Sequence, residues 1–306
     1  METKKYTGKI ISTISNKGGV GKTISSIEIA NILGKARKKV LLIDTDMNTG
    51  DISIKLKLRN EVTLLEFFEK KETDLSNLIK HIHNFDLIPG AGGNFKFANI
   101  NYLQKLKFIK AFKEISENYD YTILDLGAGI DRVTLDFALT ADYTTIVTTP
   151  EDIQTGYGCA KAAAERLNEN EKRLSSKNRD YIRVHQFSPF FIFNKAKKNQ
   201  ASNIFSGVRR AAEVSKSKDD IRLKPRFLGS VPPDYKLVGR SYSEYHTPIS
   251  EAYPTSEMAK SYKEIAHFFL SLDNNNGFHH IHKKSPIDKI LSLFKNEKEP
   301  VPELEY

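Results

Sequence analysis

The sequence predicts an α/β fold in which a mostly parallel, twisted sheet carries helices on both faces. Short, continuous apolar runs recur along the chain, as in strands buried on both faces. Segments with apolar residues at helical spacing separate these runs. Strands that alternate with helices imply right-handed crossovers and therefore parallel strand pairing.

Each expected element follows from its own stretch of sequence. The first expected helix is "ISSIEIANILGKARK", because Ile24, Ile27 and Ile32 stand at helical spacing in it. The expected strands are "KIISTIS" (9–15), "KVLLID" (39–44), "NFDLIPG" (84–90), "YTILDLG" (121–127), "YTTIVTTP" (143–150), "FFIFNKA" (190–196) and a run within "RFLGSVPPD". Further helices are expected at 62–82, 101–118, 131–140, 153–171 and 256–272.

The composition of the chain changes after Leu272. We expect one folded domain over 1–272, followed by a polar linker over 273–285. An amphipathic helix is expected over 286–298 and an acidic tail over 299–306.

Bulk composition limits the class of protein. Hydrophobic residues make up 39% of the 306 residues and the mean hydropathy is −0.45. No apolar run approaches a membrane span, and "METKKYTGK" does not read as a signal peptide. The single cysteine, Cys159, excludes an internal disulfide. These features favour a cytoplasmic protein, and its net charge of +9 permits an anionic partner.

The sequence "NKGGVGKT" is a modified phosphate loop, with Asn16 where the pattern has its first glycine. Glycines let backbone N–H groups surround phosphates, and the following helix adds its partial positive charge. We expect Lys22 to contact the β- and γ-phosphates and the Thr23 hydroxyl to bind Mg²⁺. The alternative is a glycine turn that holds two lysines. The expected phosphate-binding residues are Lys17, Gly18, Gly19, Val20, Gly21, Lys22 and Thr23.

With "KGGVGKT" between a strand and a helix, the chain resembles the MinD/ParA family of deviant Walker A ATPases. In that family the early lysine, here Lys17, reaches across a dimer to the phosphates of ATP in the other subunit. The resemblance implies a P-loop fold, a homodimer that holds ATP and Mg²⁺, and slow hydrolysis stimulated by a protein partner. A cation near the leaving phosphate would also stabilise charge in the transition state.

Two acidic motifs resemble the switches of this family. In "LLIDTDMNTGD", the resemblance implies that Asp46 activates the attacking water and that Asp44 supports the magnesium ion. In "YTILDLGAGID", it implies that Asp125 is the Walker B-type carboxylate near Mg²⁺. The Gly127 N–H is then expected to meet the γ-phosphate. The alternative for Asp125 is a helix cap.

Two later loops resemble the adenine-binding segments of the family. Asn194 ends the strand in "FIFNKA", and Pro232, Pro233 and Asp234 lie in "GSVPPD". The resemblance implies that these four residues line the adenine pocket. The alternative for Asn194 is a turn residue.

The stretch "DLGAGIDRVTLDFALTADYTTIVTTPED" resembles the FlhG (FleN, YlxH) branch of flagellar-number regulators, with MinD-type division-site selectors close behind. The FlhG resemblance implies a role in flagellar number or placement and a partner such as an FlhF-like GTPase or a flagellar component. Two features depart from that branch. That branch often begins with a glutamine-rich activating segment, whereas here about ten residues precede the first expected strand, and the first switch has the sequence "DTDMNTGDIS".

The expected C-terminal helix carries Ile287, Ile290, Leu291 and Phe294 at i, i+3, i+4 and i+7, which forms one apolar stripe. A short amphipathic helix of this kind lies in the headgroup region of a membrane. Two copies in an ATP dimer would then make binding at the inner membrane surface reversible. The alternatives are that the helix packs on the folded domain or that a partner covers it.

A basic segment and a histidine cluster allow other functions. Residues 195–226 contain ten Lys/Arg against three acidic residues, which permits ParA-like binding to nucleoid DNA or simply a solvated helix face. His279, His280 and His282 lack a cysteine or carboxylate framework and are interpreted as linker residues and not as a metal site. A third hypothesis is that the protein is a nucleotide-dependent scaffold whose ATP hydrolysis is incidental.

Overall fold

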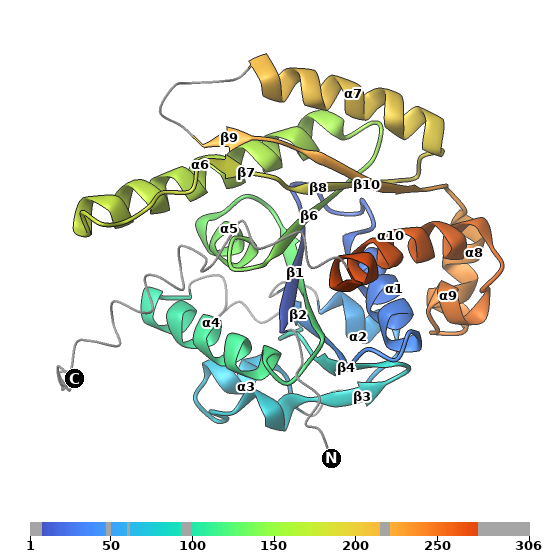
Figure 1. Ribbon diagram of the computed structural model, residues 1–306. Coiled ribbons are helices and arrows are strands. Elements are labelled where there is room, and N and C mark those ends of the chain that lie inside the picture. The colour runs from blue at the N-terminus through green and yellow to red at the C-terminus, as the bar shows by residue number, and fades with distance from the viewer. Residues whose placement is uncertain (1–7, 47–49, 60–61, 93–99, 215–220, 275–306) are drawn as a thin grey trace.

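The computed structural model describes residues 8–46, 50–59, 62–92, 100–214 and 221–274. Its centre is an eight-stranded sheet with the order β10-β8-β6-β1-β5-β2-β4-β3 (Figure 1). All neighbouring strands are parallel except β3 and β4, which confirms the predicted mostly parallel sheet. The strands are β1 (Lys9–Ser15), β2 (Val40–Thr45), β3 (Lys80–Ile82), β4 (Phe85–Ile88), β5 (Tyr121–Ala128), β6 (Tyr143–Thr148), β8 (Phe190–Asn194) and β10 (Arg226–Val231).

Helices cover both faces of this sheet, as predicted. One face carries α1 (Lys22–Lys35), α2 (Asp51–Lys55), α9 (Ile249–Ala252) and α10 (Glu257–Asn274). The other carries α3 (Leu64–Phe68), α4 (Tyr102–Ser116), α5 (Arg132–Ala138), α6 (Ile153–Lys177) and α7 (Lys198–Val214). A short parallel pair, β7 (Gln186–Phe187) and β9 (Arg222–Leu223), lies near the β10 edge (Figure 1). The remaining short elements are the 3₁₀ helix η1 (Leu75–Leu78), α8 (Tyr235–Gly239) and the π-helix η3 (Arg240–Glu244).

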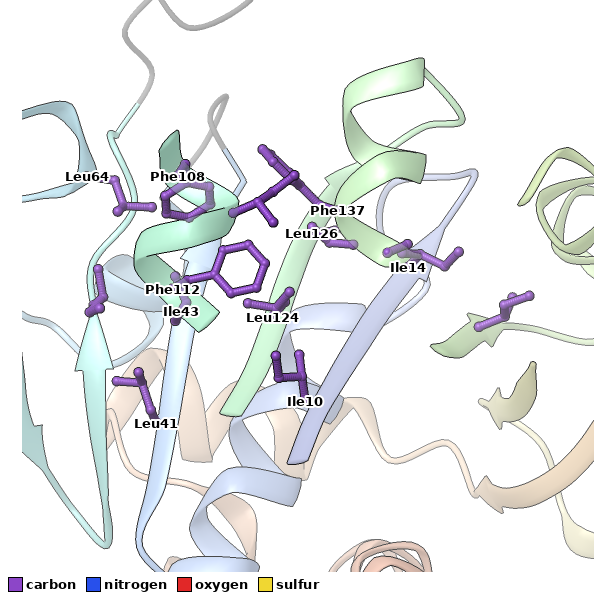
Figure 2. Close-up of a cluster of buried hydrophobic side chains, with 14 of the residues drawn as sticks. Ile10, Ile14, Leu41, Ile43, Leu64, Phe108, Phe112, Leu124, Leu126 and Phe137 are labelled. Atoms are coloured by element: carbon purple, nitrogen blue, oxygen red, sulfur yellow. The ribbon is translucent and has the colours of Figure 1, made fainter. Parts of the chain in front are cut away.

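Alternating side chains of the central strands build the two cores. Figure 2 shows Ile10, Leu41 and Leu124, from β1, β2 and β5, facing Phe108 and Phe112 of α4. Their sequence neighbours on the strands contact α1 and α10 on the opposite face, because successive strand residues point to opposite sides. The rigid strands therefore end together at one edge, where the loops that follow them meet.

The predicted helix over 62–82 is wrong. The structure has the short α3, then η1, then β3, which pairs antiparallel with β4. Lys70 has a φ of 61° just after α3, and the Glu72 carboxylate accepts bonds from the Thr73 and Asp74 N–H groups. Side-chain bonds to nearby backbone groups of this kind compete with a continuing helix.

Other differences between the predicted and observed elements lie in the second half of the domain. Helix α6 continues to Lys177, beyond the expected 153–171, and α7 occupies most of the basic segment. The short α8, η3 and α9 were not predicted. Among the described residues, no helix is both long and apolar enough to cross a bilayer. The predicted linker beyond Asn274, the amphipathic helix and the acidic tail lie outside the described residues.

Candidate nucleotide-binding site

The predicted phosphate loop connects β1 to α1, as the motif requires. Gly19 and Gly21 have φ values of 76° and 93°, a conformation that glycine adopts without strain. A Cβ atom on Gly21 would lie 2.0 Å from Nδ2 of Asn194. Gly21 is therefore required both for the backbone turn and for the close approach of β8, which carries Asn194.

Lys22 and Asp125 form a buried ion pair behind this loop. Lys22 Nζ lies 3.1 Å from Asp125 Oδ1, and their side chains are 7% and 0% exposed. The Ser26 hydroxyl donates to the same oxygen at 3.0 Å. Burial alone would lower the pKa of Lys22, but the Asp125 carboxylate outweighs it and the pKa is raised. Lys22 thus stays charged beside the loop.

Asp44 and Asp46 lie at the end of β2, next to Asp125 in the sheet register. Asp44 is fully buried, and burial followed by the charge of Asp125 raises its pKa well above the ordinary value. Its Oδ1 accepts a bond from the Asp46 N–H at 3.1 Å. A Cβ atom on Gly90 would come within 2.8 Å of the Asp44 carboxyl carbon. Gly90, whose role the sequence did not reveal, therefore makes room for this carboxyl group.

The carboxylates offer a position that fits Mg²⁺. Asp125 Oδ2 is buried and has no hydrogen-bond partner among the described residues, whereas Oδ1 is occupied by Lys22 and Ser26. An unpaired buried carboxylate oxygen is costly, and Mg²⁺ prefers oxygen ligands of this type. Thr23, buried at the start of α1, and Asp44 supply further oxygen atoms. The residues present therefore fit the cation that the sequence predicts.

Lys17 contacts Asp152, a residue that the sequence did not single out. Lys17 Nζ lies 2.6 Å from Asp152 Oδ1, and the two side chains are 57% and 17% exposed. The hydrogen bond from Lys17 is the main cause that lowers the pKa of Asp152. Within one chain Lys17 is thus held beside its own loop by a residue 135 positions away. Its reach across a dimer stays a prediction.

The four predicted adenine-contacting residues lie together beside the phosphate loop. The Asn194 side chain donates to the Val20 carbonyl at 2.8 Å and accepts from the Lys195 N–H at 3.0 Å. Asp234 accepts from the Leu237 N–H and caps α8. A cavity of about 200 Å³ is lined by Gly19, Gly21, Asn194, Lys195, Pro232, Pro233, Asp234 and Tyr235, among others.

Lys195 is a further residue of this region that the sequence did not mark. It has a φ of 58°, and its Nζ donates to the Gly19 carbonyl at 3.2 Å. The same Nζ lies 5.7 Å from the centre of the Tyr235 ring. Lys195 therefore connects the wall of the cavity to the phosphate loop.

The structure brings the predicted loop, switch and adenine-contacting residues to one edge of the sheet. The Gly127 backbone lies beside Asp46, whose Oδ1 would be 3.5 Å from a Cβ on that glycine. The membrane-contacting residues predicted at 287–294 and the histidines at 279–282 lie outside the described residues. Within the described part of the chain, no group of three or more His, Cys, Asp or Glu residues is arranged to hold a metal ion by itself.

Comparison with known proteins gives a family match. Residues 8–176 match the AAA domain family (AAA_31), which is more than half of the chain. The matched stretch includes the phosphate loop, both predicted switches and Asp152.

Two curated relatives are similar over much of the chain. The antiactivator FleN of Pseudomonas aeruginosa is 25% identical over 84% of this chain and 85% of FleN. The flagellum site-determining protein YlxH of Helicobacter pylori is 30% identical over 58% of this chain and 57% of YlxH. The chain thus aligns with most of FleN but with little more than half of YlxH.

Two solved structures have a similar fold. The cell division ATPase MinD of Pyrococcus furiosus has a TM-score of 0.59 at 19% identity, covering 87% of this chain and 99% of MinD. A plasmid partition protein from Borrelia burgdorferi, bound to AMPPNP, has a TM-score of 0.57 at 26% identity. That match covers 86% of this chain and 99% of the partition protein.

Proposed function

The chain belongs to the AAA domain family, among its MinD/ParA-type P-loop proteins, and from this premise we propose that it is a Mg²⁺-dependent switch ATPase that dimerises around ATP and regulates flagellar number or placement. One observation carries the proposal. A buried lysine and three carboxyl groups meet behind a phosphate loop, and one carboxylate oxygen lacks a partner within the described part of the chain. Such a site suits a triphosphate with its cation.

Each residue has a distinct task in the proposed reaction. Lys22, Thr23 and the loop N–H groups hold the phosphates. Thr23, Asp44 and Asp125 would hold Mg²⁺, which neutralises phosphate charge when bound. Asp46, beside the Gly127 backbone, orients the attacking water. The AMPPNP bound to the Borrelia relative supports ATP as the nucleotide.

The proposed dimer gives a function to the exposed Lys17–Asp152 pair. Lys17 must leave Asp152 before it can contact phosphates in a second subunit. Because exposed ion pairs contribute only about 0–1 kcal/mol, this exchange costs little. Lys17 then supplies positive charge where it develops in the transition state.

The dimer is tested by measuring mass in solution with Mg²⁺ and ATP. We expect Asp46→Ala to bind ATP without hydrolysing it and therefore to accumulate as a dimer. Lys17→Ala should remain a monomer with hydrolysis reduced about a hundredfold. Lys161→Ala, which removes an exposed lysine on α6, is the matched control and should behave as wild type. Equal dimerisation of the Lys17 and Lys161 variants would refute the proposed dimer.

Membrane association is the next part of the proposal. Vesicles of anionic lipid should pellet the full chain with ATP and not with ADP, because two weak anchors act together in the dimer. Ile290→Glu places a charge on the apolar stripe and should abolish pelleting. Ser292→Glu adds the same charge on the polar side of the helix, and this variant should retain most of the pelleting. Loss in both variants, or in neither, would refute this mode of binding.

The flagellar role is supported by the printed names of FleN and YlxH and is tested on cells. Cells that lack the protein should carry an altered number or position of flagella. Expression of the Lys22→Ala variant in these cells should not restore the normal pattern. A normal flagellar pattern with misplaced division septa would favour the MinD-like alternative instead.

A ParA-like DNA-binding function is the second candidate, favoured by exposed cations on α7 and β9. Lys195 and Lys198 of the basic segment are bound to Gly19 and Glu264, respectively. Arg209, Arg210 and Arg222 remain on the exposed surface. ATP-dependent and salt-sensitive pelleting with DNA, lost in Arg209→Glu, would support this function.

A further inference from the structure

A groove outside the nucleotide site lies between α7 and the edge strand of the sheet. Strand β10 ends the strand order, and β9 precedes it along the same edge (Figure 1). Helix α7 packs against β10, and a cavity of about 490 Å³ separates part of α7 from residues 222–227. This groove has one helical wall and one wall made of an edge strand.

The groove has an apolar floor. The Phe205 and Phe227 rings lie 5.5 Å apart, and the half-buried Leu223 belongs to the same lining. Aromatic and aliphatic groups at the bottom of a cavity favour an apolar side chain as the ligand.

The rim of the groove is positively charged. Arg209, Arg222 and Lys224 line it, with Glu213 as an acidic member. None of the ion pairs found among the described residues involves these three cations. The groove therefore fits a ligand that is acidic on one side and apolar on the other.

The backbone of the edge strand is oriented for pairing. The N–H groups of Arg222, Lys224 and Arg226 donate inward, to the carbonyls of residues 185, 187 and 189. Successive N–H groups of a strand point to opposite sides, so those of Leu223 and Phe227 point towards the open edge. An extended peptide can add to such an edge by main-chain hydrogen bonds.

The acidic tail of this chain, 299–306, has the matching pattern. Its even positions are all apolar and its odd positions are acidic apart from Val301. This alternation with a period of two is typical of a half-buried strand. The even positions are Pro300, Pro302, Leu304 and Tyr306, and the acidic odd positions are Glu299, Glu303 and Glu305.

We propose that the acidic tail binds in the groove between α7 and β9–β10 as an added strand. Its apolar side contacts Phe205 and Phe227, and its glutamates pair with the cations of the rim. Pro300 and Pro302 stand two positions apart, so both point their missing N–H groups to the same, outer side. The inner side of the added strand can therefore still pair with β9–β10. Its outer side cannot pair with a further strand, so the sheet ends at the tail.

The connection from α10 to the groove must be spanned by residues 275–298. Phe268, in the last turns of α10, has its ring 5.0 Å from that of Phe190, and Phe190 pairs with Arg226 at the start of β10. The next residue, Phe269, accepts a bond from the Tyr121 hydroxyl of β5, so the connection from the end of α10 must pass β1, β6 and β8 to reach the groove. With 275–285 extended and 286–298 helical, residues 275–298 could span roughly 55 Å, so length does not prevent docking. A tethered ligand of this kind acts at an effective concentration near millimolar.

Docking would also hold the predicted amphipathic helix between α10 and the groove. That consequence for membrane binding rests on the proposed function, whereas docking itself does not. The test below therefore uses no lipid and no nucleotide.

Disulfide cross-linking in the full chain tests the proposal directly. The native Cys159 is fully buried, and burial raises the pKa of its thiol to about 12, so it does not compete. Ser206→Cys places a thiol on the groove side of α7, and Tyr306→Cys places one on the tail. Ser176→Cys, on the exposed end of α6 outside the groove, replaces Ser206→Cys in the control pair.

We expect the groove pair to form an intramolecular disulfide at least tenfold faster than the control pair, at a rate independent of protein concentration. Changing Glu299, Glu303 and Glu305 to Lys should remove most of that advantage. Adding Arg209→Glu, Arg222→Glu and Lys224→Glu should restore it, because the charges are exchanged. Circular dichroism checks that each variant is folded.

Three outcomes would overturn the proposal. Equal rates for the groove and control pairs would show that the tail has no preference for the groove. An unchanged rate after the glutamates become lysines would contradict charge pairing. Dimers whose yield rises with concentration would assign the groove to the tail of a second copy or to another acidic strand.

Discussion

Two buried carboxyl groups, one on α1 and one facing its first turn from β5, differ in how completely their oxygens are hydrogen-bonded. Glu28 accepts bonds from the Tyr242 hydroxyl and the Ile249 N–H, both at 2.5 Å, and from the Ser250 N–H at 2.9 Å. Asp125, close to the start of the same helix, has one buried oxygen that no described residue contacts by a hydrogen bond. A buried carboxylate whose two oxygens both accept hydrogen bonds stabilises the fold. One with an oxygen that accepts none indicates a ligand site.

The neighbours of Glu28 extend this structural role. Asn31 donates to the Ser250 hydroxyl at 2.9 Å, and Lys35 donates to the Ser250 carbonyl at 3.1 Å. Asn84, at the turn between β3 and β4, bonds both Asn31 and Glu251. The middle of α1 is therefore fixed to α9, while its first turn faces the nucleotide site.

The largest expected effect is on stability, at Glu28. Glu28→Ala leaves two backbone N–H groups and a buried hydroxyl without an acceptor, which costs about 3–5 kcal/mol of unfolding free energy. Tyr242→Phe removes one bond and should cost about 1–2 kcal/mol. Urea denaturation measures both. Equal losses in the two variants would contradict the assignment of Glu28 as the centre of this cluster.

Asp125→Asn should show the reverse pattern. We expect ATP hydrolysis to fall at least about a hundredfold, equivalent to about 2.7 kcal/mol of transition-state stabilisation. The free energy of unfolding should fall by no more than about 2 kcal/mol, because Lys22 loses its buried partner while the repulsion between Asp125 and Asp44 is relieved. Steady-state kinetics and urea denaturation of the same samples measure the two effects.

Asp136 provides a matched control for a buried carboxylate without a ligand. It pairs with Lys105 and with Arg166 Nε at 2.8 Å, which joins α4, α5 and α6. Asp136→Asn should therefore lower stability by about 2–3 kcal/mol and leave hydrolysis by the folded protein unchanged. A specific loss of hydrolysis would contradict the distinction between bonded and spare carboxylates.

The pH dependence of stability sharpens the comparison further. The pKa of Asp44 is raised in the folded state by burial and by Asp125, so the folded state binds a proton that the unfolded state releases above about pH 4. The contribution of Asp44 to stability without nucleotide should therefore decrease as the pH rises from 4 towards 7. Asp44→Asn should reduce this slope. An unchanged slope in urea denaturation from pH 4.5 to 7.5 would contradict it.

The smallest expected effect on stability is at Lys17. Lys17→Ala removes an exposed ion pair with Asp152 and should change the free energy of unfolding by less than about 0.5 kcal/mol. Asp152→Asn should do the same. A loss above 1.5 kcal/mol in thermal or urea denaturation would show that the pair has a structural role.

Local patterns in the sequence predicted the parallel sheet, whereas the switch and adenine-contacting residues were predicted from the resemblance to the MinD/ParA family. The apolar runs mark buried strands, and the carboxyl ends of those strands necessarily bring Asp44, Asp125 and Asn194 to one edge. The failure over 62–82 has a different origin. There the antiparallel pairing of β3 with β4, a tertiary contact, outweighed apolar residues at helical spacing.

The residues that the sequence did not reveal act through contacts distant in the chain. Asp152 meets Lys17, and Gly90 makes room for Asp44, across separate strands. Glu28 lies on an apolar helix and bonds groups more than 200 positions away. Neither periodicity nor motif spacing carries information about such pairs.

Calorimetry of ATP binding, with Mg²⁺ and with EDTA, tests the central claim most directly. The spare oxygen of Asp125 predicts that Mg²⁺ strengthens ATP binding to the wild type at least tenfold. In Asp125→Asn most of this magnesium dependence should disappear, while Asp136→Asn should retain it. An equal effect of Mg²⁺ on the wild type and Asp125→Asn would contradict the claim that this carboxylate completes the nucleotide site.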